Sequence, residues 1–201
     1  MTFAASTSSG ACLKISLDDV EPKVVRRLEV PLTIRLDRLH LVLQTAFGWE
    51  NYHLWEFLAG RDARFGIPNP DWGNGPLDGR KANLATALDE AGKKRLKYLY
   101  DFGDGWEHTI RVEAIGPASP GILYPRLLHA EGRCPPEDVG GPPGYAEYLD
   151  AMADPRHDRH DELLQWRGPA FDPDIVDLAV LSADVLALAR KWSSPPARKR
   201  S

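Results

Sequence analysis

Hydrophobic and polar residues alternate along two neighbouring stretches near the middle of the chain, and this is the strongest local pattern in the sequence. The apolar positions of the first stretch are Leu96, Tyr98, Tyr100 and Phe102. Those of the second are Trp106, His108, Ile110 and Val112. A period of two residues predicts β-strands. The two stretches are therefore predicted to form an antiparallel hairpin that turns at 103–105.

The loop length decides which residues of this hairpin face each other. A two-residue loop would place the apolar residues of one strand against the polar residues of the other. A three-residue loop, with Gly105 in the left-handed conformation, pairs Phe102 with Trp106 and Tyr100 with His108. In this register Asp101 and Glu107 share the other face, where a base such as Lys97 or Arg111 is expected to offset their repulsion.

The rest of the first half reads as strands and short helices. Alternating residues predict strands at 13–17 and 24–30, which form a second hairpin, and a strand with large residues on both faces at 52–58. Apolar residues at helical spacing predict a helix that starts at Leu36, after Arg35 as N-cap, and ends at Gly48. A loop at 60–80 and a short helix at 84–90 complete this half.

The second half reads as helices. The proline- and glycine-rich stretch at 116–144 is expected to lack regular structure, and helices are predicted at 145–152, 161–166 and 174–192. On the last helix, Val176, Val180, Leu181, Val185 and Leu188 are predicted to point inward. The fold class is therefore α+β: a mostly antiparallel sheet with helices packed on one side and a helical C-terminal half.

The length of 201 residues fits one domain. We expect that domain at 12–192, after a disordered leader at 1–11 and before a disordered basic tail at 193–201. The last twelve residues hold five basic side chains and no acid, so the remainder carries 20 basic against 29 acidic residues, a net charge of −9. Such a body repels a phosphate backbone, so nucleic-acid binding is expected only weakly, through the tail.

Two cysteines are too few for a disulfide framework, and neither a signal peptide nor a membrane-spanning stretch is apparent. The sequence therefore predicts a cytoplasmic protein with no membrane association.

Three motifs in order resemble the plasmid pRiA4b ORF-3-like family over about Leu13 to Leu181. They are Leu39-His40 with Phe47-Gly-Trp-Glu-Asn51, then Tyr100-Asp-Phe-Gly-Asp-Gly-Trp-Glu-His108, then Cys134-Pro-Pro-Glu-Asp138 with Gly140-Gly141 and Gly144-Tyr145. Arg35 stands where the family usually has a hydroxyl N-cap, and Val25 where it often has an aromatic residue. The resemblance implies a compact α+β domain, found on plasmids and as a passenger of insertion elements, some labelled resolvase-like. The nucleophilic serine among arginines and the DNA-reading helix-turn-helix of a serine recombinase are not visible.

The acidic hairpin holds one candidate for chemistry. Asp101, Asp104, Glu107 and His108 lie within eight residues, a composition that could serve a metal-dependent hydrolase or nuclease. Turns favour Asp, however, and alternation sends His108 to the face opposite Asp101 and Glu107. We therefore interpret the hairpin as structural, with His108 as a hydrogen-bonded core histidine. No tight divalent site is expected there.

The cysteine motif is a second candidate. Cys134 as a nucleophile would need a basic neighbour that the motif does not supply, and Glu137 and Asp138 suit capping of the helix that follows. A zinc site of His40, His53, His108 and Cys134 would lack the short-range ligand pairs that mark such sites. We expect no metal and no cofactor.

The aromatic residues favour binding. Some of them are expected to line a groove for a peptide or a small ligand: Trp49, Tyr52, Trp55, Trp72, Trp106 and Tyr124. The first hypothesis is a non-catalytic binding or interaction module of mobile or accessory genetic elements, whose partner is a protein, peptide or small molecule. Its candidate binding residues are Trp49, Tyr52, Trp55, Trp106, His108, Cys134, Glu137 and Asp138. The alternative is the metal-dependent hydrolase or nuclease of the acidic hairpin.

Overall fold

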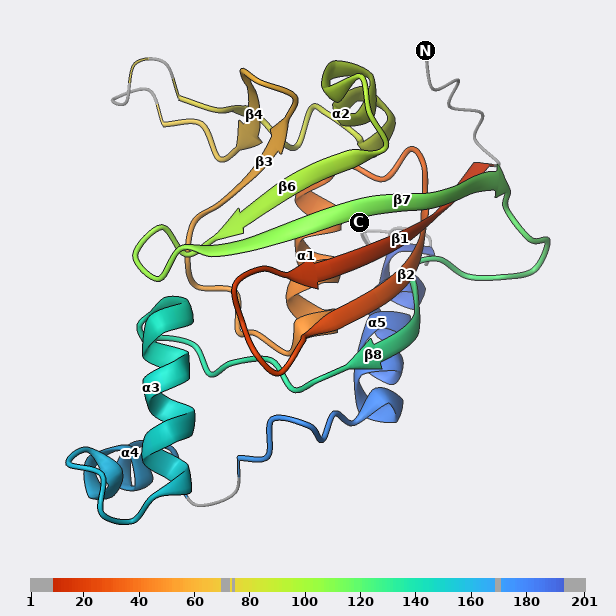
Figure 1. The fold of residues 1–201 in the computed structure, drawn as a ribbon. Helices are drawn as coiled ribbons and strands as arrows, with labels where there is room; N and C mark the ends of the chain where they lie inside the picture. Colours follow the sequence, from red (N-terminus) through yellow and green to blue (C-terminus); the bar gives the residue numbers. More distant parts are fainter. Residues whose placement is uncertain (1–8, 70–72, 74, 169–170, 194–201) are drawn as a thin grey trace, which may run out of the picture.

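A computed structural model describes residues 9–69, 73, 75–168 and 171–193, and in these residues an eight-stranded sheet is accompanied by five helices (Figure 1). The strands are β1 Ser9–Leu17, β2 Val25–Pro31, β3 Trp55–Ala59, β4 Ala63–Gly66, β5 Leu77–Asp78, β6 Arg95–Tyr100, β7 Trp106–Pro117 and β8 Arg126–Glu131. The helices are α1 Leu36–Phe47, α2 Leu84–Ala91, α3 Gly141–Ala153, α4 His160–Arg167 and α5 Leu178–Ser193.

The strand order is β5-β4-β3-β6-β7-β1-β2-β8, and every neighbouring pair is antiparallel except β4 and β5. The predicted α+β class is confirmed. Within the part of the chain that the structure describes, no helix has both the length and the apolar character needed to span a bilayer.

Most of the predicted leader and tail lie outside the described residues, as does Trp72. Ser9 to Ala11, which we assigned to the leader, belong to β1. All three pair with β7, and Gly10 and Ala11 also pair with β2. Ser193 closes α5.

Alternation builds a sheet with one apolar and one polar face. On β1, Leu13, Ile15 and Leu17 are buried, whereas Lys14 between them is exposed. Helix α1 crosses behind the central strands and covers the apolar face, while α5 packs against α1 and β8 (Figure 1). Helices α3 and α4 lie beyond the end of the β6–β7 hairpin. Loops at that end therefore meet the segment that leads into α3.

Helix α1 has the predicted bounds. Gly48 ends it in the left-handed conformation, with φ 82°. Arg35 occupies the N-cap without a side-chain cap bond, and its guanidinium instead pairs with Asp37 in the first turn.

The predicted irregular stretch at 116–144 was partly wrong. Strand β8 lies within it, and α3 already begins at Gly141 because Pro142 and Pro143 occupy the first turn, where a missing N–H costs little. Helix α5 starts at Leu178, later than predicted. Its buried residues are Val185 and Ala189, whereas Val180 is exposed.

The predicted register of the β6–β7 hairpin was wrong by two residues. Tyr100 pairs with Trp106 and Tyr98 with His108, so the loop spans 101–105. Gly105 is left-handed as predicted, but Asp101 is left-handed too, at φ 55°, and its carbonyl accepts from the Gly105 amide at 2.7 Å. This turn leaves Phe102 exposed and separates Asp101 from Glu107. A shift of two residues keeps the paired residues of β6 and β7 on their predicted faces, whereas Phe102 and Asp101, now in the loop, do not follow the predicted alternation.

Candidate functional site

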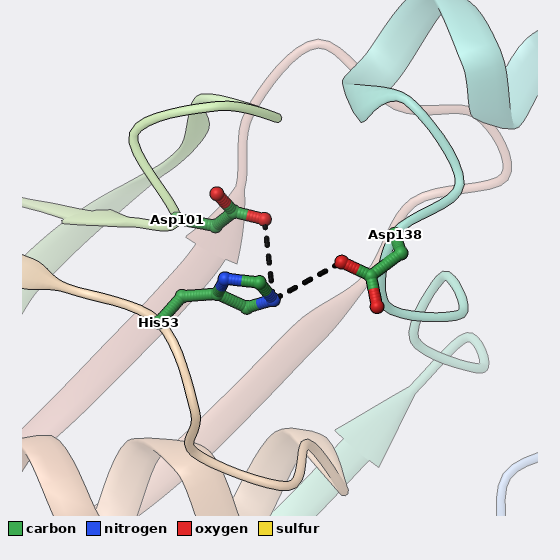
Figure 2. A group of neighbouring side chains, drawn as sticks. All are labelled: His53, Asp101 and Asp138. Carbon is green, nitrogen blue, oxygen red and sulfur yellow. Dashed lines mark ion pairs between the residues drawn. The ribbon is translucent and has the colours of Figure 1, made fainter.

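Three loops meet at the end of the sheet and bring together His53, Asp101 and Asp138, which we call the His53 cluster (Figure 2). His53 comes from the α1–β3 loop, Asp101 from the hairpin loop and Asp138 from the segment before α3. His53 Nε2 lies 3.5 Å from Asp101 Oδ2 and 3.2 Å from Asp138 Oδ1. All three atoms lie within 4.8 Å of one another. One imidazole and two carboxylates therefore face a common point.

Backbone contacts hold the loops in place. The Asp101 amide donates to the Leu54 carbonyl at 2.9 Å, which ties the hairpin loop to the α1–β3 loop. Its side chain accepts from the Gly103 amide through Oδ1 at 2.9 Å, which leaves Oδ2 turned toward His53. Asp138, like Asp101, is left-handed, at φ 60°. Left-handed residues other than glycine are uncommon and concentrate at turns and functional sites.

A buried glutamate anchors the segment that carries Asp138. Glu137 accepts a hydrogen bond from the Tyr100 hydroxyl and another from the Glu50 amide at 2.8 Å. Its own carbonyl accepts from Arg167 at 2.7 Å. Burial and the Glu137 carboxylate raise the pKa of Tyr100 well above its ordinary value, so its hydroxyl stays a donor. Glu137 thus holds the loop, and the neighbouring Asp138 carboxylate is 60% exposed.

The acidic hairpin residues do not converge. Glu107 pairs with Lys97 at 3.0 Å, one of the two bases expected beside it, and Lys97 also pairs with Asp18 at 2.6 Å. Asp104 accepts from the Gly140 amide at 3.1 Å. Of the hairpin residues considered for catalysis, only Asp101 belongs to the His53 cluster.

His108 is a core histidine. It is fully buried, its Nδ1 lies 3.3 Å from the Tyr98 carbonyl oxygen, and its ring makes a T-shaped contact with the Phe47 ring, with the centroids 4.8 Å apart. Burial lowers its pKa to about 4. His108 therefore stays neutral near pH 7. It lies in the core and is not part of the His53 cluster.

Three other predicted binding residues also belong to the core. Trp49 is buried, stacks on Tyr100 at 5.0 Å and donates from Nε1 to the Pro135 carbonyl at 3.0 Å. Trp106 is fully buried. Burial raises the pKa of the Cys134 thiol well above its ordinary value, which disfavours the thiolate that a nucleophile needs.

Tyr52 and Trp55 line a pocket of about 460 Å³, here called the Tyr52 pocket. Three large apolar residues of its lining are exposed: Tyr52 at 58%, Ile67 at 50% and Leu54 at 39%. Buried Trp55 stacks on His40 at 4.5 Å, and both contribute to the wall. His53 is shared between this pocket and the His53 cluster.

Both nitrogens of His40 are engaged. Asn51 Oδ1 can only accept, so His40 Nε2 carries the proton, and Nδ1 then accepts from the Tyr98 hydroxyl at 2.7 Å. That hydroxyl accepts in turn from Gln44 at 3.0 Å. Burial lowers the His40 pKa to about 4. His40 is therefore a neutral structural part of the wall.

From the sequence, we weighed His53 and His40 as partners of Cys134, either beside it as a base or with His108 in a zinc site, and the fold does not make the zinc grouping. Asp101 and Asp138 were each noted for other roles. No local spacing relates residues 53, 101 and 138, so the sequence carries no short-range signal for their meeting.

Comparisons with known proteins agree with the three motifs. The family model described as plasmid pRiA4b ORF-3-like protein matches residues 9–180. An uncharacterised protein, y4hQ of Sinorhizobium fredii (strain NBRC 101917 / NGR234), is 53% identical over 188 residues, which cover 93% of this chain and 96% of that protein. The crystal structure of MM3350, a protein of unknown function from Methanosarcina mazei Go1, is similar with a TM-score of 0.78 and 30% identity, over 90% of this chain and 99% of the other. The chain therefore belongs to the plasmid pRiA4b ORF-3-like family.

Proposed function

We propose that the protein is a non-catalytic binding module and that the Tyr52 pocket is its ligand site. The observation that carries this proposal is the cluster of exposed apolar side chains, Tyr52, Leu54 and Ile67, around a cavity of about 460 Å³. Soluble proteins seldom expose large apolar groups together without a binding role. The volume of the Tyr52 pocket lies within the range of small-molecule sites.

The lining favours a small aromatic group. The stacked rings of Trp55 and the neutral His40 contribute to the lining, the three exposed side chains add apolar surface, and Arg80 and Asp37 are available for polar contacts. An aromatic ring of a small molecule, or an aromatic side chain of a peptide or partner protein, would complement a lining of aromatic, apolar and polar groups.

Binding is favoured over catalysis because the hairpin groups needed for hydrolysis lie apart. Asp104 contacts the Gly140 amide, Glu107 pairs with Lys97, and His108 is buried. In the Tyr52 pocket, His40 has no free ring nitrogen for proton transfer.

Amide NMR titration with indole and p-cresol, the side-chain analogues of Trp and Tyr, tests the pocket. We expect millimolar binding, the range of such fragments, with shifts concentrated at pocket residues. Ile67→Ser should weaken it severalfold. Ile122→Ser is the matched control, because Ile122 is similarly exposed, at 40%, but does not line the pocket. Equal affinity in the two variants, or no saturable shift, would contradict the proposal.

The cellular setting is part of the same proposal. A cytoplasmic role in mobile or accessory genetic elements is supported by the family and by two free cysteines. Any nucleic-acid affinity is proposed to be weak and to reside in the basic tail, outside the described residues. Deletion of 194–201 should abolish it. Salt-sensitive binding that survives the deletion would place a basic surface on the body instead.

A further inference from the structure

We propose that His53, Asp101 and Asp138 bind a divalent transition-metal ion, with Zn²⁺ as the preferred cation. This goes beyond the ligand pocket, because it assigns a second site and a different chemistry. The three ligand atoms come from three loops and lie within 4.8 Å of one another (Figure 2). At separations of 3.2 and 3.5 Å from His53 Nε2, both carboxylate oxygens can share a central ion at about 2.0–2.4 Å.

The state of the ligand atoms points to an ion. His53 Nε2 is buried and has no hydrogen-bond partner of acceptable geometry among the described residues. Asp101 is the more buried carboxylate, with only 9% of its side chain exposed, and within the described chain its Oδ2 accepts no hydrogen bond. Buried polar atoms without partners are rare in folded proteins, since each costs free energy. An ion between them would satisfy both atoms.

The surroundings hold the imidazole in place before any ion binds. The rings of Tyr52 and Tyr100 meet the His53 ring edge-on, at centroid distances of 5.5 and 5.7 Å. The Asp101 amide donates a hydrogen bond to the carbonyl of Leu54, which directly follows His53 in the same loop. Ligands held this way lose little conformational freedom on binding, which favours affinity.

The ligand set selects among cations. One imidazole nitrogen with two carboxylate oxygens suits Zn²⁺, whose open sites have three protein ligands and a water. Mg²⁺ prefers oxygen ligands in a strict octahedron, and Ca²⁺ takes six to eight oxygens. Asp138 is 60% exposed, so water can reach the remaining position. We therefore expect Zn²⁺ and Mn²⁺ to bind better than Mg²⁺ or Ca²⁺.

The hairpin prediction differs from this site in its ligands. This site departs from our expectation of no metal. That expectation was argued for other ligand sets, one of which, Asp101, Asp104, Glu107 and His108, does not converge. His53 and Asp138 reach Asp101 from other loops. An ion pair of a protonated His53 with the two carboxylates is the competing explanation, and it predicts no metal affinity.

Calorimetric titration of the chelator-treated full chain with Zn²⁺, Mn²⁺, Mg²⁺ and Ca²⁺ tests the proposal. We expect one Zn²⁺ per chain with a micromolar or lower Kd. Asp138→Asn should weaken Zn²⁺ binding at least tenfold, and His53→Gln should abolish it. Asp62→Asn and His129→Gln change exposed residues outside the cluster and should bind like the unaltered chain.

Visible absorption of the Co²⁺-loaded chain gives a second readout, because a nitrogen ligand and low coordination number intensify its bands. Asp138 is exposed, so Asp138→Asn is expected to fold even if His53→Gln does not. Absence of Zn²⁺ binding, or an affinity unchanged by Asp138→Asn, would overturn the proposal. Ile67→Ser should leave Zn²⁺ binding intact, which separates this test from that of the Tyr52 pocket.

Discussion

The buried guanidinium of Arg26 donates from Nε to the carbonyl of Ala46 in the last turn of α1, at 2.7 Å. Nη1 donates to the carbonyls of Val25, Glu131 and Gly132. One side chain thus joins β2, the C-terminal end of α1 and the end of β8. Carbonyls at a helix C-terminus carry partial negative charge, which favours a cation there.

Arg26→Ala should destabilise the fold by about 3–5 kcal/mol, because it leaves several buried carbonyls without a donor and opens a cavity. Urea unfolding measures this loss. The control is Arg27→Ala, which removes an exposed ion pair with Glu113 and should cost no more than about 1 kcal/mol. Similar losses in the two variants would mean that the Arg26 bonds contribute little.

Stability should fall in mild acid because of two buried histidines. Burial lowers the pKa of His40 and His108 to about 4 in the folded chain, from an ordinary value of 6.5. Between these values the unfolded chain binds protons that the folded chain does not. The free energy of unfolding is therefore unaffected by these groups above pH 6.5 and decreases as pH falls to about 4, by up to about 2.7 kcal/mol per pH unit.

Chemical denaturation of the His40→Gln variant across this range checks the assignment. The difference from the unaltered chain should shrink as pH falls from 6.5 to 4, since the variant lacks one of the two groups. His129→Gln, at an exposed position, should leave the pH dependence as it was. Parallel curves for His40→Gln and the unaltered chain would rule out a depressed pKa at His40.

The alternating pattern predicted which face each paired residue of β6 and β7 occupies, but not its partner across the hairpin. A shift of two residues preserves every face, so the hydrophobic pattern cannot exclude it. The actual register depends on Asp101, whose left-handed backbone and carbonyl bond to Gly105 close a longer loop. Likewise, Asp101 and Asp138 stood out in the sequence, but their meeting with His53 depends on tertiary contacts between three loops.

Tyr100→Phe should destabilise the fold by about 1–3 kcal/mol, because the buried Glu137 carboxylate loses a hydroxyl donor. Faster hydrogen exchange of the Glu50 amide, which donates to the same carboxylate, is also expected. Tyr145→Phe is the matched control. Its buried hydroxyl has no hydrogen-bond partner among the described residues, so its removal should be nearly neutral. An equal loss of unfolding free energy in the two variants would mean that the effect of Tyr100→Phe does not come from the hydrogen bond to Glu137.

Gly141→Ala should disturb the start of α3, because Gly141 is left-handed at φ 69° and a Cβ there would lie 2.2 Å from the Asp104 carbonyl oxygen. The matched control is Gly92→Ala, which also has a left-handed backbone, at φ 59°, but has no atom within 4 Å of the added Cβ. Gly92→Ala should lower the free energy of unfolding by about 1–2 kcal/mol, the cost of placing a residue with a Cβ in the left-handed conformation. Gly141→Ala should cost more, and hydrogen exchange should show faster exchange in the first turn of α3. Thermal unfolding of the two variants compares their stability. Equal losses of stability would show that the hairpin loop moves to make room for the added methyl group. The close approach of Asp104 and Gly141 would then not be what holds α3 against the sheet.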